Sequence, residues 1–295
     1  MNTLKLSILF ASIAFSSTIQ AQSIKTITGF HHIESVVSDS RNLYVADIGK
    51  DLAPQAKDGD GAILKLDSKG NVVEATFVKE KLNAPKGLAI YKDVLWLTDI
   101  DRILAIDLKT GNKLYEIDFS KDSSFLNDIA VWDASTLYVS ATDVSKLFKV
   151  NLIDKTYSEV VLNQPIAGIN GLYCPKKGNV LYVNGIGSNN KANGVVGAVN
   201  LKNNTFTQLT TFEGIYDGLA VVNDVLYVSN WVAFEKKGIL LSIDLNTKRL
   251  KTLPMPEHFS GPADFIFDGN TIVLPAMITG ELHFIPFNSS LTQKL

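Results

Sequence analysis

The chain has 295 residues, of which 46% are hydrophobic and 20% are charged. This composition supports one substantial core and excludes disorder, collagen and coiled coil. The 28 basic and 30 acidic residues leave a formal charge of −2, so the chain lacks the positive field that non-specific binding to nucleic acid or anionic membranes requires. We therefore expect a soluble globular protein whose partner is a small molecule and not a nucleic acid.

The chain has a single cysteine, Cys174, and only four histidines. It therefore forms no intramolecular disulfide, and a zinc site rich in cysteine or histidine is not expected. Any metal ion would be bound by oxygen ligands.

The first 21 residues have the pattern of a secretory signal peptide. A positive charge at Lys5 precedes an apolar run over residues 6–15, and a short segment of small and polar residues ends at Ala21. The run is too short to cross a bilayer, and no cysteine near the cleavage point could carry a lipid. We predict a signal peptide over residues 1–21 and one domain over residues 22–295, exported as a monomer to the periplasm or the exterior without membrane insertion.

A short pattern recurs about every 46 residues along the mature chain, with about six copies in all. In each copy a polar residue is followed by a small or apolar stretch, a turn and an aliphatic-aromatic strand such as LYV or LWL. The copies span residues 34–47, 86–99, 127–140, 170–184, 217–230 and 264–275.

The segments within each copy are four to seven residues long, and their apolar cores alternate with polar neighbours, as is typical of β-strands. No stretch of the mature chain shows a sustained helical period. A repeat of this length matches the four-stranded blade of a propeller. We therefore predict an all-β fold, a six-bladed β-propeller with four strands per blade, in which residues 24–30 supply the outer strand of the last blade.

The leading residues of the six copies should form a ring, since the innermost strand of each blade lines the central channel. They are Glu34, Lys86, Asn127, Asn170, Asp217 and Asp264. Four of them, Glu34, Asn127, Asn170 and Asp217, offer hard oxygen ligands that suit Ca²⁺, although other divalent cations are possible. The alternative is that these residues are polar because the mouth of the channel is wet, and that Asn-Asp, Asn-Gly and Asp-Gly are ordinary turn dipeptides.

With these motifs the chain resembles the calcium-dependent hydrolase propellers that include senescence marker protein (regucalcin), gluconolactonase and the luciferin-regenerating enzyme. The resemblance spans residues 30–287. The motifs that carry it are Glu34-Ser35, Asn127-Asp128, Asn170-Gly171-Leu172 and Asp217-Gly218.

The resemblance implies one calcium ion bound by Glu34, Asn127, Asn170 and Asp217. It also implies that Asp217 is the catalytic residue, acting as general base or nucleophile while the metal polarises the substrate carbonyl. The resulting hypothesis is a secreted calcium-dependent hydrolase of lactones or related esters. The alternative is a non-catalytic, metal-stabilised propeller that binds a ligand or a protein.

Four further residues are candidates for substrate binding: Lys86, Asn230, Trp231 and Asp264. The ammonium group of Lys86 would either contact an anionic substrate or extend into water. Asp264 would alternatively support the metal ligands from behind, or simply mark the wet start of the sixth blade.

Overall fold

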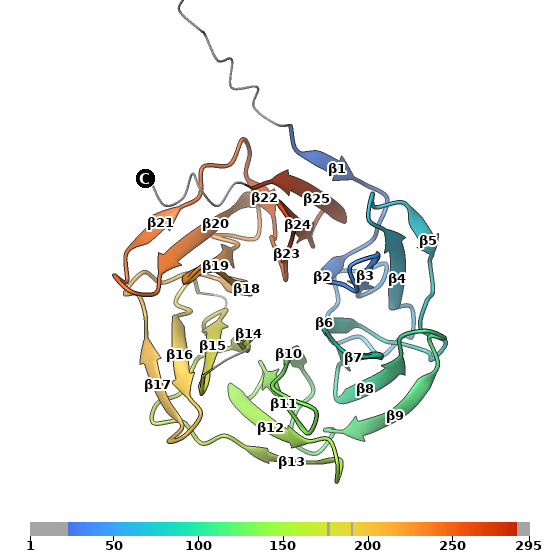
Figure 1. Ribbon diagram of the computed structural model, residues 1–295, viewed down its shortest axis with the longest axis horizontal. Coiled ribbons are helices and arrows are strands. Elements are labelled where there is room, and N and C mark those ends of the chain that lie inside the picture. The colour runs from blue at the N-terminus through green and yellow to red at the C-terminus, as the bar shows by residue number, and fades with distance from the viewer. Residues whose placement is uncertain (1–22, 176–177, 190, 288–295) are drawn as a thin grey trace, which may run out of the picture.

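The computed structural model describes residues 23–175, 178–189 and 191–287, which form six antiparallel sheets arranged around a central axis (Figure 1). Each sheet is a blade of four strands, and the fifth blade carries one additional short strand. The predicted six-bladed β-propeller is therefore confirmed. The predicted signal peptide lies outside the described residues.

The first three blades follow the chain from the inner to the outer strand. Blade 1 contains β2 (Ile33–Ser38), β3 (Asn42–Asp47), β4 (Ala62–Asp67) and β5 (Val72–Glu74). Blade 2 contains β6 (Pro85–Tyr91), β7 (Val94–Asp99), β8 (Arg102–Asp107) and β9 (Lys113–Asp118). Blade 3 contains β10 (Leu126–Val131), β11 (Thr136–Ala141), β12 (Lys146–Asn151) and β13 (Thr156–Glu159).

The next two blades have the same order. Blade 4 contains β14 (Ile169–Tyr173), β15 (Val180–Gly185), β16 (Val196–Asn200) and β17 (Thr205–Gln208). Blade 5 contains β18 (Tyr216–Val222), β19 (Val225–Asn230), β20 (Lys236–Asp244) and β21 (Leu250–Thr252), and β22 (Phe259–Ser260) pairs with β20.

The sixth blade closes the ring with both ends of the described chain. It contains β23 (Ile266–Asp268), β24 (Thr271–Ala276), β25 (Glu281–Pro286) and the N-terminal strand β1 (Lys25–Ile27). Strand β1 pairs antiparallel with β25, so that Lys25 lies opposite Phe284. The outer strand predicted within residues 24–30 is therefore present. Among the described residues, no helix has the length and hydropathy needed to cross a membrane.

The middle strands of the blades are buried on both faces. In β3 the residues from Leu43 to Ala46 are at most 1% exposed, and every residue of β11 is buried. The expected alternation of apolar and polar residues is therefore wrong for these strands, because each blade is covered by a neighbouring blade on either side. The outer strands β5 and β13 are largely exposed.

The inner strands are interrupted by a bulge at the ring position. In each of the first five blades the pairing between the inner and middle strands shifts there, for example between Ile169 and Leu172 in blade 4. A bulge frees adjacent residues from the regular ladder and redirects their side chains. This irregularity places the ring residues of the first five blades, whereas Asp264 of the sixth blade lies in the segment before β23.

Glycine follows the ring residue in three blades because the next blade passes close to it. A Cβ atom on Gly171 would overlap the backbone carbonyl oxygen of Asp217, and one on Gly218 would lie 2.6 Å from that of Ala263. The Asn-Gly and Asp-Gly pairs are therefore not turn dipeptides, as the alternative supposed. They lie within inner strands, where the absence of a side chain lets two backbones approach.

Candidate functional site

The six predicted ring residues lie together inside the channel, and none is more than 8% exposed. The expectation of a wet mouth is therefore wrong. Five of them sit at the start of an inner strand and Asp264 lies two residues before β23, all on what we call the strand-start face of the disc. The opposite face, where hairpins lead from the inner to the middle strands, is called the hairpin face.

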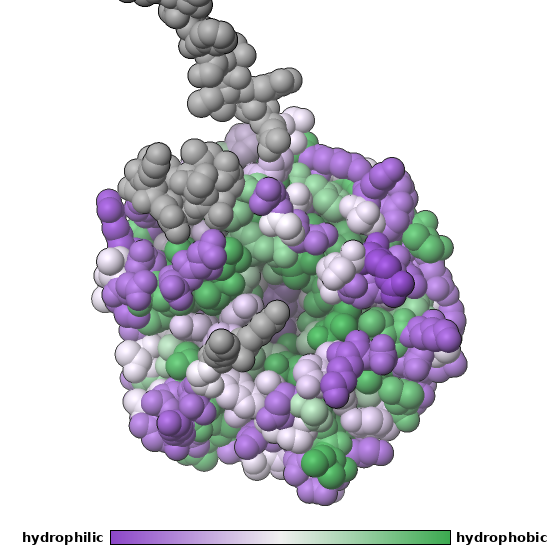
Figure 2. Space-filling model, viewed as in Figure 1, coloured by the Kyte–Doolittle hydropathy of each residue, from purple (hydrophilic) through white to green (hydrophobic). Residues whose placement is uncertain are grey.

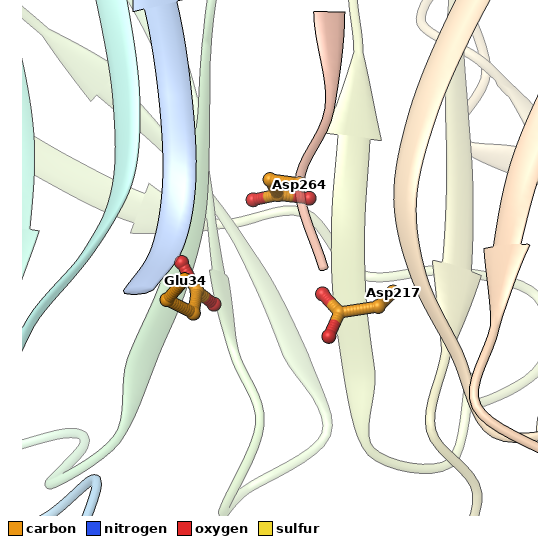
Figure 3. A group of neighbouring side chains, drawn as sticks. All are labelled: Glu34, Asp217 and Asp264. Carbon is orange, nitrogen blue, oxygen red and sulfur yellow. The ribbon is translucent and has the colours of Figure 1, made fainter. Parts of the chain in front are cut away.

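Three carboxylates of the ring converge on one point. Ligand atoms of Glu34, Asp217 and Asp264 all lie within 4.8 Å of one another. Figure 3 shows them pointing toward a common space from β2, from the start of β18 and from the segment before β23. Two of them belong to the predicted ligand set. Asp264, predicted as a substrate-binding or supporting residue, is as well placed to bind a metal as the other two.

Several buried oxygen atoms of the ring residues have no hydrogen-bond partner among the described residues. They are Glu34 Oε2, Asn127 Oδ1, Asn170 Oδ1, and both carboxylate oxygens of Asp264. A buried polar atom left unpaired costs about 1–3 kcal/mol, so five such atoms among the ring residues call for a missing partner.

The amide group of Asn170 is oriented by its neighbours. Its Nδ2 donates to the carboxylate of Asp217 at 3.3 Å and to the carbonyl oxygen of Tyr216 at 3.4 Å. This arrangement leaves the Oδ1 atom of Asn170 as a free acceptor. The donor set offered to an ion is therefore entirely oxygen, which is the chemistry expected for Ca²⁺.

Asp128 is a site residue that the sequence reasoning missed. It is buried, it accepts hydrogen bonds from the backbone of Leu172 at 2.6 Å and of Ile129 at 2.7 Å, and its carboxyl group interacts with that of Asp264. The Asn127-Asp128 pair was its signal, since both residues are polar within one apolar strand. Only the bulge explains how both side chains lie inside.

Lys86 is buried in the ring and does not extend into water. Its ammonium group donates to the carbonyl oxygen of Ala84 at 2.9 Å and lies 4.9 Å from the centre of the Phe125 ring. Burial lowers the pKa of Lys86 to about 8, while Glu34 and Asp99 favour its charged form.

The other two substrate-binding candidates differ in their contacts. Trp231 is buried beside the carboxylates, and its indole Nε1 donates to Asp217 Oδ2 at 2.9 Å. The side-chain oxygen of Asn230 accepts from the backbone of Ile215 at 3.2 Å and of Val232 at 2.9 Å. Asn230 thus fixes the segment that leads into β18, and through this segment it positions Asp217, the second residue of the strand.

Apolar side chains cover the ring on the strand-start face. The cluster that we call the apolar layer consists of Ile48, Ala84, Ile100, Ile215, Trp231, Ala263 and Met277. Ile186 of the fourth blade packs against it. A cavity of about 280 Å³ at its edge is lined by Ile186, Ile215 and Phe234 but by none of the six ring residues.

The channel is open toward the hairpin face. A hollow of about 730 Å³ extends inward between the inner strands and reaches Ser35, Asp128 and Asp264. Figure 2 shows a hollow at the centre of the disc, with hydrophilic surface at its bottom. The site is therefore reached from one face and covered on the other.

Burial disfavours the ionised form of the carboxyl groups of the site. It raises the pKa values of Asp128 and Asp217 to about 7, and it raises those of Glu34 and Asp264 well above their ordinary range, with further contributions from the neighbouring carboxylates. Among the described residues, four carboxyl groups meet here with one ammonium group, that of Lys86. A bound dication would offset most of this excess of negative charge.

We expect the chelator-treated protein to lose stability between pH 5 and pH 7.5. A carboxyl group whose pKa is raised on folding stabilises the folded state when protonated, and this contribution disappears as the pH rises through the raised value. The melting temperature should fall by about 5 °C or more, since 1 kcal/mol corresponds to about 2–4 °C in a domain of 150–250 residues. Thermal unfolding with chelator and with Ca²⁺ checks this result.

With Ca²⁺ the carboxylates are neutralised by the ion, so the same pH range should cause no such loss. The prediction would be contradicted if the melting temperature fell equally with and without Ca²⁺. It would also be contradicted if the melting temperature of the chelator-treated protein rose with pH.

The fold and the site together define a six-bladed β-propeller with a buried acidic centre on its axis. No protein-family model matches the sequence, and no curated protein matches it. Solved propeller structures do match. Virginiamycin B lyase from Staphylococcus aureus superposes with a TM-score of 0.59 at 16% identity, over 90% of this chain and 99% of that one. Hydrazine synthase from Kuenenia stuttgartiensis has a TM-score of 0.58 at 11% identity, over 88% of this chain and 76% of that one. At these identities the likeness shows a common fold.

Proposed function

We propose that this protein is a calcium-dependent hydrolase that opens a lactone or a related ester. The observation that carries the proposal is the convergence of Glu34, Asp217 and Asp264 within 4.8 Å, in a ring whose buried oxygen atoms include several with no hydrogen-bond partner among the described residues. The proposed ligands are the four predicted residues Glu34, Asn127, Asn170 and Asp217, to which the geometry adds Asp264.

The bound ion would polarise the carbonyl oxygen of the substrate and stabilise the charge that develops on it. Asp217 is oriented for a role as base, because Trp231 donates to one of its oxygens and Asn170 to the other. In the absence of an ion, burial raises the pKa of Asp217 to about 7; a bound dication would favour the ionised carboxylate, which is the form that accepts a proton.

The step proposed for Asp217 is the activation of water. The carboxylate accepts a proton as the water oxygen bonds to the carbonyl carbon. The ester C–O bond then breaks, and the proton passes to the departing alkoxide oxygen. Water is consumed, and a hydroxy acid, or an acid and an alcohol, is released.

Two further observations support a catalytic role. The motifs resemble those of the regucalcin and gluconolactonase propellers, and a protein of similar fold is named a lyase, so this architecture hosts enzymes. The apolar run before Ala21 supports export of the mature chain. The competing function is a metal-stabilised propeller that binds a ligand without turning it over.

Calcium titration of the chelator-treated protein tests the proposal. The unaltered protein should bind about one Ca²⁺, and Glu34→Gln should weaken binding by about tenfold or more, since losing 1.4 kcal/mol is a tenfold change. Glu235→Gln is the matched control, because Glu235 is an exposed glutamate paired with Lys237. Calorimetry measures the affinity, and a screen of lactones and esters with Ca²⁺ measures turnover.

Absence of Ca²⁺ binding, or equal binding by both variants, would remove the metal site. Binding without turnover of any lactone or ester would favour the non-catalytic propeller. Parallel titrations with Mg²⁺ and Zn²⁺ establish which ion is preferred.

A further inference from the structure

The two ends of the channel offer different access to the acidic centre. On the strand-start face the apolar layer covers the ring, and the small cavity at its edge is lined by no ring residue. On the hairpin face the hollow of about 730 Å³ reaches Asp264. Asp264 also belongs to the cluster with Glu34 and Asp217, so the hollow ends at the candidate metal site.

The hollow is polar at its bottom, and its lining as a whole has more apolar than polar surface. Ser35, Asp128 and Asp264 lie at the bottom, and the walls are formed by the later residues of the inner strands. The aromatic side chains among the lining residues are Tyr91, Trp132, Tyr173, Phe265 and Phe267. A cavity of several hundred Å³ with apolar walls and a few convergent polar groups is typical of a site for a small organic ligand.

Polar atoms at the bottom of the hollow are available to interact with a ligand. Asp264 is 8% exposed, and apart from its interaction with the carboxyl group of Asp128, its carboxyl oxygens have no hydrogen-bond partner among the described residues. In Figure 3 its carboxylate faces the same space as those of Glu34 and Asp217. A carbonyl group at the bottom of the hollow would therefore reach the cluster, while the body of the same ligand remained among the apolar walls.

We propose that the hollow is the substrate site, and that the substrate is a lactone or ester with an apolar or aromatic substituent, which enters from the hairpin face. This inference rests on the proposed function. Burial of the substituent against the apolar parts of the lining supplies affinity by removing apolar surface from water. A polyhydroxylated sugar lactone gains less from these walls, because each hydroxyl group placed against an apolar part of the lining loses water without gaining a partner.

Two isoleucine-to-tryptophan variants distinguish the two faces. Ile90 is half-buried and lines the hollow. Ile186 is also half-buried and packs against the apolar layer on the other face. Ile90→Trp narrows the proposed site, whereas Ile186→Trp makes the same change of side chain away from it. Val221→Trp, which places the bulk in the hollow from blade 5, replaces Ile90→Trp should that variant fail to fold.

The probes are 2-naphthyl acetate as substrate, its inert ketone analogue 2-acetonaphthone as ligand, and glucono-δ-lactone as the polar comparison. We expect Ile90→Trp to lower kcat/KM for the naphthyl ester at least tenfold and to weaken ketone binding to a similar degree. Ile186→Trp should change both by less than about twofold. Calcium affinity should be unchanged in both variants, which shows that the acidic centre is intact.

Loss of activity in Ile186→Trp with full activity in Ile90→Trp would place the entrance on the strand-start face and overturn the inference. Hydrolysis of the sugar lactone alone, insensitive to Ile90→Trp, would also overturn it and leave the hydrolase in place. Ketone binding that Ile90→Trp removes, without turnover of any ester by the unaltered protein, would support the hollow as a ligand site and contradict the hydrolase. Failure of the unaltered protein to bind the ketone would overturn the inference.

Discussion

Replacement of Asp217 by asparagine is expected to reduce turnover at least a thousandfold while the propeller stays folded. The variant keeps the shape of the side chain but removes a negative charge from the buried cluster and the base from the proposed reaction. General base catalysis contributes about 10²–10⁴-fold, and loss of a charged ligand also weakens Ca²⁺ binding. Initial rates with saturating Ca²⁺, together with circular dichroism and calorimetric titration, check the result.

Asp224→Asn is the matched control for this variant. Asp224 is exposed in the hairpin between β18 and β19, where its φ of 59° also suits asparagine. This change should leave both turnover and Ca²⁺ affinity within about twofold of the unaltered protein. Turnover retained by Asp217→Asn would remove Asp217 from the mechanism, even if the metal site survived.

Replacement of Gly171 by alanine is expected to destabilise the protein by about 3 kcal/mol, the upper end for forced overpacking. The added Cβ would overlap the carbonyl oxygen of Asp217 and lie 2.9 Å from Nδ2 of Asn184. Blade 4 and blade 5 would have to separate, and Asp217 would move with its strand. Denaturant unfolding measures the loss of stability, and Ca²⁺ titration measures the displacement of the ligand.

Gly269→Ala provides the comparison for that variant. A Cβ on Gly269 would meet nothing within 4 Å, and its φ of 58° leaves only the conformational cost of the left-handed region, about 1–2 kcal/mol. It should leave Ca²⁺ affinity unchanged. Gly171→Ala could instead prove no more destabilising than Gly269→Ala, with equal Ca²⁺ affinity. The close approach of the two blades would then make no measurable difference to the free energy of unfolding.

The fold could be predicted because each blade repeats the same local sequence pattern. Residues 86–99 and 217–230 carry the same order of polar residue, apolar stretch, turn and strand, and the count of such copies equals the count of blades. The position of β1 was also predictable, since a strand-like segment before the first copy had one unpaired edge to complete. The burial of both faces of the middle strands was not predictable from alternation, because it depends on the neighbouring blades.

The site was predictable only in part. Glu34 and Asp217 occupy the same position in their copies of the repeat, which identified them as neighbours although 183 positions separate them in the sequence. Asp264 occupies the same position in the sixth copy, but this position did not indicate its role. Asp128 was missed, because strict alternation along a strand directs adjacent side chains to opposite faces, and only the bulge brings both Asn127 and Asp128 inside.

The amino-acid sequence by itself determined the number of blades, the four strands of each, and which residues begin the inner strands, because repeat length and apolar periodicity are local properties. The tertiary structure alone decided how those residues are used. The bulges turn the ring inward, the close contact between blades requires Gly171 and Gly218, and the apolar layer covers one end of the channel while the other remains open. Burial, pKa and access depend on groups that are distant in the sequence, so they follow from closure of the ring and not from any single repeat.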